Sequence, residues 1–515
     1  MFRDESSKVI QKAHAQWGGP SGSPIEGDPG SSGSSPTSST AWTPTTPSAD
    51  IDNKPPAPRG QTPAAHAAAR QIVSTRVPRR VEPSLEQRGL QFYIDRYLMN
   101  HPDSPRSSNE LADYCGSADA TQNVMIAVGL AGMSNLLGNK SMNVVARTKY
   151  VTALKQTGQL IATNSGNQFA DIATSLRSIV TLALFEVVQG KGSRITAGSA
   201  NTHIHGAVAL LRSVLPVPHA PSGGARGVLQ LMFSMFIPSQ MTDTPLPPGF
   251  FECLKLCKEL LESSPEACCV DLAMAIARLL QLLAMAEQPG FIDDQPNTND
   301  MIQQTLIMEG VFASLEAQLQ EAYPFLLNKG LFSPKALFHG QWHTYNEIWG
   351  ARIWNHFRWA RILLNQMIIK FTADFHNSSD RYISEHQREQ CYTVMRRMAE
   401  DILTSVPSHW HHPVLDITTA RRFEASGQGG SGAAGLPSLL WHITIAGCAP
   451  QVPPDLWDWA HDVLQVVWKD MGMQHALALS EVMEEHKAKV EKEAARALSP
   501  LAKDREPVVV KVEED

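Results

Sequence analysis

The sequence predicts an all-α protein, an irregular array of packed helix pairs preceded by a disordered N-terminal arm. Beyond Pro83, apolar residues recur every three or four positions, and no segment shows the apolar–polar alternation typical of a strand. Before that point, most positions between Gly19 and Gly60 are Ser, Thr, Pro or Gly. Such a composition cannot bury a core, which is why the first part of the chain is predicted to be disordered.

Composition divides the chain into three regions. Residues 1–82 form the arm, residues 83–499 the helical region, and residues 500–515 a flexible acidic tail. Within the helical region, Pro216–Arg226 and Gln428–Pro437 are rich in Gly, Ser and Pro and are expected to be loops between helices. No repeat of about 34 or 40 residues is present, so a regular helical solenoid is not predicted.

Hydrophobic periodicity places the helices of residues 83–499. Segment 123–137 is apolar nearly all round, as a buried helix is, and Gly138 is expected to end it. The next helix carries Val144, Val151, Leu154 and Ile161 as its large apolar residues. Leu176 lies in the middle of a further apolar stripe and is expected in the core. The predicted helices are 90–98, 123–137, 144–163, 169–187, 204–214, Phe251–Leu261, Cys268–Ala286, Met301–Glu321, Asn346–Phe371, Glu385–Leu403, Trp457–Gln474 and His475–Leu498.

Charge and hydropathy exclude several classes of protein. Forty-four Lys and Arg residues against 51 Asp and Glu residues give a net charge of −7, which argues against a chain that coats nucleic acid or an anionic membrane. The first ten residues are charged and lack the apolar core of a signal peptide. The longest apolar runs, Val124–Met133 and Met274–Met285, are shorter than the roughly 18–20 residues that span a bilayer. We therefore expect an intracellular protein without a membrane segment.

The seven cysteines are expected to be reduced and to behave as small apolar residues. Cys253, Cys257, Cys268 and Cys269 lie on or beside predicted helices. An alternative is that Cys253 and Cys257, four residues apart on one helix face, bind a metal. No further pair at ligand spacing accompanies them, so the first interpretation is preferred.

Glycine-rich and histidine-rich segments are the candidates for catalytic or metal sites. Gly190-Lys191-Gly192 lacks the earlier glycine and the preceding strand of a phosphate-binding loop, so we expect a polar loop. Gly429–Gly432 lacks the spacing of a nucleophile elbow and is expected to be a linker. His203 and His205, two residues apart on a helix, point to different faces, and Gly206 beside them is expected at a close helix contact.

The densest histidine group is His409-Trp410-His411-His412. These imidazoles could share a metal, but no matched pair at helical spacing supports them. The preferred interpretation is a half-buried Trp410 among solvated histidines. Since no catalytic constellation emerges, the sequence predicts no enzymatic activity, no catalytic residue and no metal site.

Aromatic and basic residues are interleaved in segment 342–361. This pattern could form a stacking surface for nucleic acid. The apolar stripe through the same segment favours a core helix whose arginines extend to solvent. The residues concerned are Trp342, Trp349, Trp354, Phe357 and Trp359, with Arg352, Arg358 and Arg361.

Six segments, in order, resemble the helical regulatory region of the fungal-specific transcription factors of the zinc binuclear cluster class. The resemblance covers about residues 84–485. The Trp that the family carries shortly before a His-x-x-Gly-Ala run is absent, and Ser199-Ala200-Asn201 stands there instead. The six segments are Asn123–Asn135 (NVMIAVGLAGMSN), Ala146–Asn164 (ARTKYVTALKQTGQLIATN), Asp171–Val188 (DIATSLRSIVTLALFEVV), Thr202–Ser213 (THIHGAVALLRS), Ile353–Ile368 (IWNHFRWARILLNQMI) and Leu439–Gly447 (LLWHITIAG).

The first residues, Met1–Ala13, resemble the segment that follows the DNA-binding zinc cluster in this family. That cluster needs about six cysteines within roughly 30 residues to hold zinc and direct a helix to DNA. The first cysteine of the chain is Cys115. We therefore expect zinc only where a cysteine cluster precedes this sequence, and no DNA-binding residue within it.

The resemblance implies a nuclear regulator of RNA polymerase II genes that acts through its helical regulatory region. Its partners would be transcription-machinery proteins, a homodimer partner or a small-molecule effector, with DNA contacted only through the missing N-terminal module. The alternative is a helical scaffold or co-regulator that modulates a related factor without binding DNA.

The C-terminal tail carries one predicted modification site. Val510-Lys511-Val512-Glu513 resembles the acceptor pattern for the small ubiquitin-like modifier, with Lys511 as the acceptor. Two alternatives are a solvated tail and a segment that adds as an edge strand to the modifier's own sheet.

Overall fold

The computed structural model describes residues 82–99, 101, 105, 107–116, 118–163, 169–190, 192–214, 222–247, 249–288, 295–373, 383–424 and 435–503. In these residues the chain is almost entirely helical, which confirms the all-α prediction. The predicted arm, apart from residue 82, and the tail beyond residue 503, with Lys511, lie outside the described residues.

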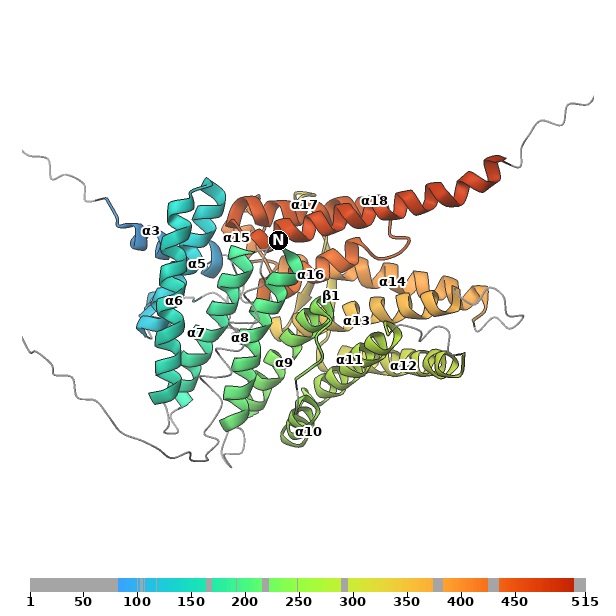
Figure 1. Ribbon diagram of the computed structural model, residues 1–515, viewed down its shortest axis with the longest axis horizontal. Helices are drawn as coiled ribbons and strands as arrows, with labels where there is room; N and C mark the ends of the chain where they lie inside the picture. Colours follow the sequence, from blue (N-terminus) through green and yellow to red (C-terminus); the bar gives the residue numbers. More distant parts are fainter. Residues whose placement is uncertain are drawn as a thin grey trace, which may run out of the picture. The chain divides into compact units, whose positions relative to one another are not determined.

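The elements follow one another along the chain in the order given below, and Figure 1 labels most of them. They are α3 (Leu85–Tyr93), η1 (Ile94–Leu98), α4 (Ser108–Gly116), α5 (Asp119–Leu137), α6 (Lys140–Thr163), α7 (Phe169–Gln189), α8 (Ser193–Val214), α9 (Ser222–Thr242), α10 (Phe250–Leu261), α11 (Ala267–Ala286), α12 (Gln295–Ala322), β1 (Phe325–Lys329), η2 (Phe338–Gly340), β2 (Gln341–Tyr345), α13 (Ile348–Ala373), α14 (Glu385–Ser405), η3 (Val406–Ser408), α15 (Ile417–Ala420), α16 (Leu436–Gly447), α17 (Pro454–Met471) and α18 (Gln474–Lys503).

Helices that are consecutive in sequence generally pack as neighbours. Helices α5, α6 and α7 contact one another, α8 packs between α7 and α9, and α13 packs against α14 (Figure 1). The long α18 lies against α16 and α17 and also contacts α7 and α8. The last helix, α18, therefore connects the C-terminal helices to two helices from the first half of the array.

Helix α5 is buried along most of its length, as its sequence predicts. It ends at Gly138, which adopts the left-handed conformation (φ 63°) that favours glycine. Two further glycines bring α3 and α5 into backbone contact, because a Cβ on Gly129 would lie 1.8 Å from the carbonyl oxygen of Gly89. Side chains larger than hydrogen at these two positions would force the helices apart.

Helix α6 leaves three of the four large apolar residues noted in its sequence exposed, although Ile161 is half-buried. Val144, Val151 and Leu154 are exposed, and the buried positions are Met142, Ala146, Ala153 and Thr157. Mostly small side chains therefore face the neighbouring helices, which permits close packing.

The prediction that no strand is present is wrong for one short hairpin. Strands β1 and β2 pair antiparallel, with Phe325 opposite Tyr345 and Lys329 opposite Gln341. Burial alternates only on part of β2, and the connecting loop is long, so neither the alternation nor a two-residue turn signal was present in the sequence. Trp342 lies on β2 rather than on a helix.

Helices α9 and α16 were not among the predicted helices. Helix α9 contains Pro238 and begins with Ser222, Gly223 and Gly224, inside the segment expected to be a loop. Helix α18 continues through Pro500 to Lys503 rather than ending near Leu498. A proline inside a helix removes one backbone hydrogen bond, and tertiary packing or the loose last turn of a helix can tolerate that loss.

Two helical segments, Ile172–Gln189 and Ala267–Ala286, are long and apolar enough to span a membrane by length and composition alone. Both pack within the array, α7 against α5, α6 and α8, and α11 against α9, α10, α12 and α13. Polar and charged residues interrupt both segments, so neither forms an uninterrupted apolar run in the sequence. Apolar helices with such neighbours on several sides are typical of a protein core.

Candidate functional site

A cavity of about 310 Å³ lies among α7, α8, α9, α13, α16 and the start of α18. Ligand sites of proteins are usually concave, mostly apolar and provided with a few convergent polar groups. This cavity has both features. Its apolar walls come mainly from α7, α8 and α9, and its polar groups mainly from α8, α13, α16, α18 and the segment after η3.

The apolar walls follow from residue size and helical spacing. Helix α7 contributes Val180, Ala183 and Val187, and α8 contributes Ala197 and Ala200, all of which repeat at the spacing of one helix face. The three alanines reach little beyond the backbone, so the facing helices enclose space that larger side chains would fill. Leu176, which was expected in the core, is partly buried, packs against the core and lines this cavity.

Helix α9 supplies the opposite wall. Pro238 lies inside this helix and has no N–H to offer to the carbonyl of Ser234, one turn earlier. Both residues line the cavity. The proline thus weakens the helical hydrogen-bond ladder at the cavity wall rather than in a loop.

The polar groups of α13 share one side of that helix. Arg352, Asn355 and His356 are three and four residues apart and all line the cavity. They are joined there by His409, which follows η3, and by His442 of α16. Residues that are up to about 90 positions apart in sequence therefore meet only through the packing of α13, α14 and α16.

Several buried polar atoms at the cavity have no hydrogen-bond partner among the described residues. They include Oδ1 of Asn201, Nδ1 of His356, Nδ1 of His475 and Nε1 of Trp441. Each of these side chains belongs to a residue no more than 8% exposed. A buried polar group without a partner costs about 1–3 kcal/mol, so a cluster of them at one cavity favours a ligand that supplies the missing partners.

The imidazoles at the cavity are neutral. Burial, together with the positive charge of Arg352, lowers the pKa of His356 to about 3. Burial, with Arg352 and Arg358 nearby, lowers the pKa of His409 to about 3, and burial lowers that of His475 to about 4. At neutral pH each ring therefore offers one donor and one acceptor and no charge.

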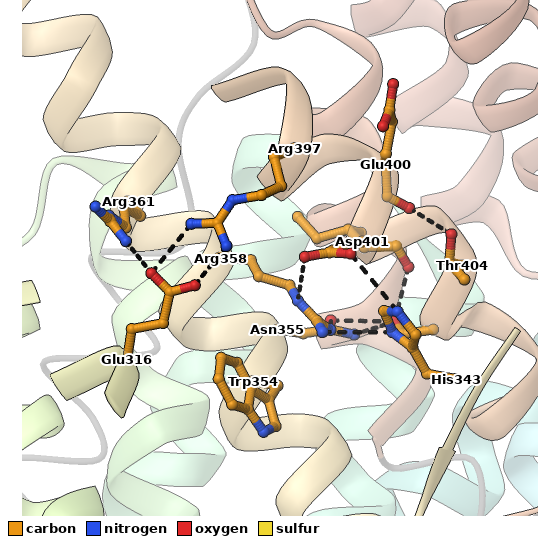
Figure 2. A network of polar contacts seen from close by, with 12 residues as sticks. Glu316, His343, Trp354, Asn355, Arg358, Arg361, Arg397, Glu400, Asp401 and Thr404 are labelled. Atoms are coloured by element: carbon orange, nitrogen blue, oxygen red, sulfur yellow. Dashed lines mark hydrogen bonds and ion pairs between the residues drawn. The ribbon is translucent and has the colours of Figure 1, made fainter. Parts of the chain in front are cut away.

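A buried polar network adjoins the cavity at Asn355 (Figure 2). The Asn355 amide donates to Nε2 of His409 (3.0 Å), and its Oδ1 accepts from Nη1 of Arg358 (3.0 Å). Arg358 is completely buried and also donates to the Tyr345 hydroxyl at 2.9 Å. The carboxylate of Asp401 lies 3.9 Å from Nε of Arg358.

His343 takes part in this network as a neutral base. Burial, reinforced by the charge of Arg358, lowers the pKa of His343 to about 2. Its Nδ1 lies 3.0 Å from the Tyr345 hydroxyl and 3.4 Å from Nη2 of Arg358, both of which can donate. The ring proton is therefore assigned to Nε2, which lies 3.6 Å from Asp401.

A second group of charges joins α12, α13 and α14 (Figure 2). The guanidinium of Arg361, almost fully buried, donates to Glu309 at 2.5 Å and also contacts Glu316. Arg397 donates to both oxygens of Glu316 at 2.6 and 3.1 Å. Although burial opposes ionisation, Arg397 and Arg361 lower the pKa of Glu316, which is therefore a carboxylate at neutral pH.

The segment with interleaved aromatic and basic residues is core, as preferred from the sequence. Trp349, Trp354 and Trp359 are at most 3% exposed. The expectation that the arginines extend to solvent is wrong for Arg358 and Arg361, which are buried and paired with polar partners. Sequence spacing could not reveal this because the partners lie on other elements.

The expectation of solvated histidines around Trp410 is also wrong. Trp410, His411 and His412 are all at most 8% exposed. His411 lies 3.1 Å from the carboxylate of Glu424, and burial lowers the pKa of His412 to about 4. The cavity also includes His409, the remaining member of this group.

The remaining histidine and glycine motifs from the sequence, at His203, Gly206 and Gly190, lie on helices or at a helix end. The Tyr150 hydroxyl donates its proton to Glu186 at 2.6 Å and therefore accepts from Nε2 of His203 at 2.9 Å. Gly206 is exposed, and a Cβ there would meet nothing within 4 Å, so the expected close helix contact is absent at this position. Gly190 ends α7 in a left-handed conformation (φ 49°).

The four cysteines singled out from the sequence are buried thiols. The Sγ of Cys257 faces the carbonyl of Ala225, and the Sγ of Cys268 faces that of Pro265. Within the parts of the chain that the structure describes, no three or more His, Cys, Asp or Glu side chains gather as a metal site would require. Segment 429–432 lies outside the described residues.

Most of the cavity was not predictable from sequence patterns. His356, His442 and His475 were not singled out, although each has apolar residues beside it on its helix. That pattern was the available signal, and it is a weak one because buried structural histidines share it. What distinguishes these three histidines from ordinary buried histidines is that all of them line the same cavity.

Part of the chain is similar to a known fungal protein. It is 28% identical over 149 residues to "Transcription factor dbaG" of Emericella nidulans, a match that covers 29% of this chain and 34% of that protein. The chain thus spans about a third of the length of this curated relative. No family model and no solved structure matches the chain.

Proposed function

We propose that this chain is the helical regulatory region of a fungal transcription regulator of RNA polymerase II genes, and that it acts in the nucleus. The observation that carries the proposal is the similarity to the transcription factor of Emericella nidulans. The all-helical array supports it, since the six segments that resemble the zinc binuclear cluster regulators all lie mainly on helices of that array, although part of one falls on undescribed residues. The proposal assigns the chain no catalytic step.

In this proposal, contact with DNA depends on a zinc cluster that would precede Met1 in a longer form of the protein. The helical region communicates with the transcription machinery or with a second copy of the chain. The formal charge of −7 is consistent with a region that works through protein contacts rather than on the phosphate backbone. The alternative is a co-regulator that modulates a related factor without binding DNA.

The proposal is tested by fusing the 515-residue chain to a heterologous DNA-binding domain in a fungal host that carries a matched reporter. We expect reporter transcription to change by several fold relative to the DNA-binding domain alone. The fusion with Gly206→Ala, an exposed position with open space around it, is the matched control and should behave as the parent. An unchanged reporter in the presence of a folded, nuclear fusion would contradict a regulatory role.

A DNA-binding assay on the purified chain distinguishes the proposed regulatory region from a protein that reads DNA itself. The purified chain should bind duplex DNA weakly, lose that binding steeply with added salt, and select no sequence from a random pool. Enrichment of one sequence at physiological salt would show a DNA-reading surface that the proposal does not contain.

A further inference from the structure

We propose that the cavity among α7, α8, α9, α13, α16 and α18 binds a small neutral molecule that has an apolar body, one hydroxyl-type donor and one carbonyl-type acceptor. The inference rests on the geometry of the cavity and not on the proposed regulatory function. The volume of about 310 Å³ lies near the lower end of the about 300–1,000 Å³ of small-molecule sites. The cavity therefore suits a compact ligand rather than a nucleotide or a peptide.

The walls define the apolar body of the ligand. Contact with aliphatic and aromatic walls favours hydrocarbon or aromatic groups, because apolar surface leaves water when they meet. A fully polar molecule such as a sugar would leave most of its hydroxyl groups unpaired along such walls. The wall residues include Val180 and Ala183 of α7, Ile204 of α8, and Phe233 and Ile237 of α9.

The lining residues favour a ligand without charge. None of the described lining residues is an acid, so a cationic ligand would lose its water without gaining a counter-ion. Arg352 is the one lysine or arginine among them, and it already has an interaction of its own within the protein. The imidazoles offer an anion no charge either, because burial lowers the pKa of His356 to about 3 and that of His475 to about 4. Burial of an ionised ligand is therefore unfavourable at this site.

Asn201 on α8 specifies the donor of the ligand. Its residue is 4% exposed, and its Oδ1 is buried without a hydrogen-bond partner among the described residues. Ala197 and Ile204, one turn before and after it on α8, also line the cavity and carry no polar side-chain atom. Because an amide oxygen only accepts hydrogen bonds, the group that pairs with it must be a donor such as a hydroxyl.

Trp441 on α16 specifies the acceptor of the ligand. This residue lines the cavity, is 8% exposed, and its Nε1 has no hydrogen-bond partner within the part of the chain that the structure describes. An indole N–H only donates, so the group that pairs with it must be an acceptor such as a carbonyl. The two requirements come from two different helices and are met by one molecule that carries both groups.

The unpaired imidazoles at the cavity can adapt to either kind of ligand group. Nδ1 of His356 on α13 and Nδ1 of His475 on α18 are also buried without a partner among the described residues. A neutral imidazole donates from one ring nitrogen and accepts at the other, so each ring can adopt the tautomer that a ligand requires. Asn201 and Trp441 have a single role each, so these two side chains determine the selectivity.

Ordered water alone satisfies the cavity less well than such a ligand. A buried water makes about three hydrogen bonds, and cavities with apolar walls stay dry. The walls from α7, α8 and α9 are mainly apolar, so water would find few partners beyond the unpaired atoms. An apolar molecule with one donor and one acceptor matches both the walls and the two side chains.

The test uses the purified 515-residue chain and four naphthalene probes of similar shape. The hydroxy ketone 2-acetyl-6-hydroxynaphthalene carries both groups, 2-acetyl-6-methoxynaphthalene lacks the donor, 2-ethyl-6-hydroxynaphthalene lacks the carbonyl, and 6-hydroxy-2-naphthoate is an anion. Isothermal titration calorimetry should show saturable binding of the hydroxy ketone and binding of each other probe at least about tenfold weaker. Equal affinity for all four probes, tighter binding of the anion, or no binding of any probe would overturn the proposal.

Two variants test the assigned roles. Asn201→Leu should weaken the hydroxy ketone by about tenfold or more and leave the methoxy ketone unchanged, since that probe has no donor to lose a partner. Trp441→Phe removes the indole N–H and should weaken the hydroxy ketone in the same way while leaving the carbonyl-free naphthol unchanged. A variant that weakens all the probes equally would contradict the role assigned to that side chain.

Three further variants locate the binding. Ala183→Phe fills the cavity and should abolish binding of the hydroxy ketone, and Ala197→Leu is a second filling variant in case the first unfolds. Ile195→Ala, at a residue that is 59% exposed on α8 and outside the cavity, is the control and should bind as the parent. Full binding by a folded filling variant would place the probe elsewhere and refute the site.

Discussion

The side-chain amide of Asn355 donates to Nε2 of His409 at 3.0 Å, and this contact joins α13 to the segment that follows η3 at the edge of the cavity. The same amide lies 2.9 Å from the Ser405 hydroxyl, and its oxygen accepts from Arg358. The His409 ring also has a hydrogen bond with the backbone of Ala351. One buried amide on α13 thus links that helix to the end of α14 and to the segment after η3.

Replacing Asn355 with leucine is expected to destabilise the protein by about 2–4 kcal/mol, because His409 and the buried Arg358 each lose a partner and stay buried. Urea unfolding followed by circular dichroism measures this loss. Gln91→Leu removes an exposed hydrogen bond to Asp95 and should change the free energy of unfolding by less than about 0.5 kcal/mol. Similar losses in both variants would mean that the buried amide is not a stabilising element.

Gly129→Ala is expected to cost about 3 kcal/mol or more. The added Cβ would lie 1.8 Å from the Gly89 carbonyl oxygen, so α3 and α5 must move apart and no side-chain rotation can relieve the clash. The matched control, Gly206→Ala on α8, meets nothing and should stabilise the protein by about 0.5–1 kcal/mol, since alanine is the better helix former. Thermal and urea unfolding of both variants give the comparison, and a neutral Gly129→Ala would show that the helices are not in backbone contact.

Arg361→Met should destabilise the protein by about 3–5 kcal/mol, because Glu309 and Glu316 would remain partly buried with less positive charge to balance them. Lys258→Met breaks an ion pair with Asp271 whose side chains are 52% and 39% exposed. Exposed pairs contribute about 0–1 kcal/mol, so this control should have little effect. The prediction fails if denaturant unfolding gives both variants the same stability.

Stability is expected to fall as the pH drops below about 6.5. An unfolded histidine binds a proton near pH 6.5, whereas burial lowers the pKa of His475 to about 4 in the folded protein. Between these values the unfolded state binds more protons, so the free energy of unfolding is greatest above pH 6.5 and declines towards pH 4. His356 and His409, with pKa values of about 3, extend this decline to lower pH.

His475→Leu should therefore flatten the decline in stability between pH 6.5 and pH 4, as measured by denaturant unfolding at a series of pH values. Gly129→Ala, which destabilises the protein without removing a titrating group, should keep the parent slope. An unchanged slope in His475→Leu would mean that this imidazole does not titrate differently in the folded and unfolded chains.

Local properties of the sequence determined which segments are helical and where several of them end. The all-round apolar pattern of 123–137 predicted a buried helix, and Gly138 ended it because a left-handed residue without a Cβ completes a helix at little cost. The choice of core over a nucleic-acid surface for Trp349, Trp354 and Trp359 also followed from helical spacing. Hydrogen bonding and side-chain periodicity act over a few residues, so the sequence alone carries this information.

Only the tertiary structure decided which face of a helix is buried and which polar groups meet. The exposed stripe of α6 and the burial of Arg358 depend on the shapes and partners that other helices present. The cavity depends on them even more, since Asn201, His356 and His475 come from helices far apart in sequence and converge only when the array packs. The sequence gives the identity of each side chain. The volume of the cavity depends on the packed helices, because it is set by how closely each pair of helix surfaces can approach.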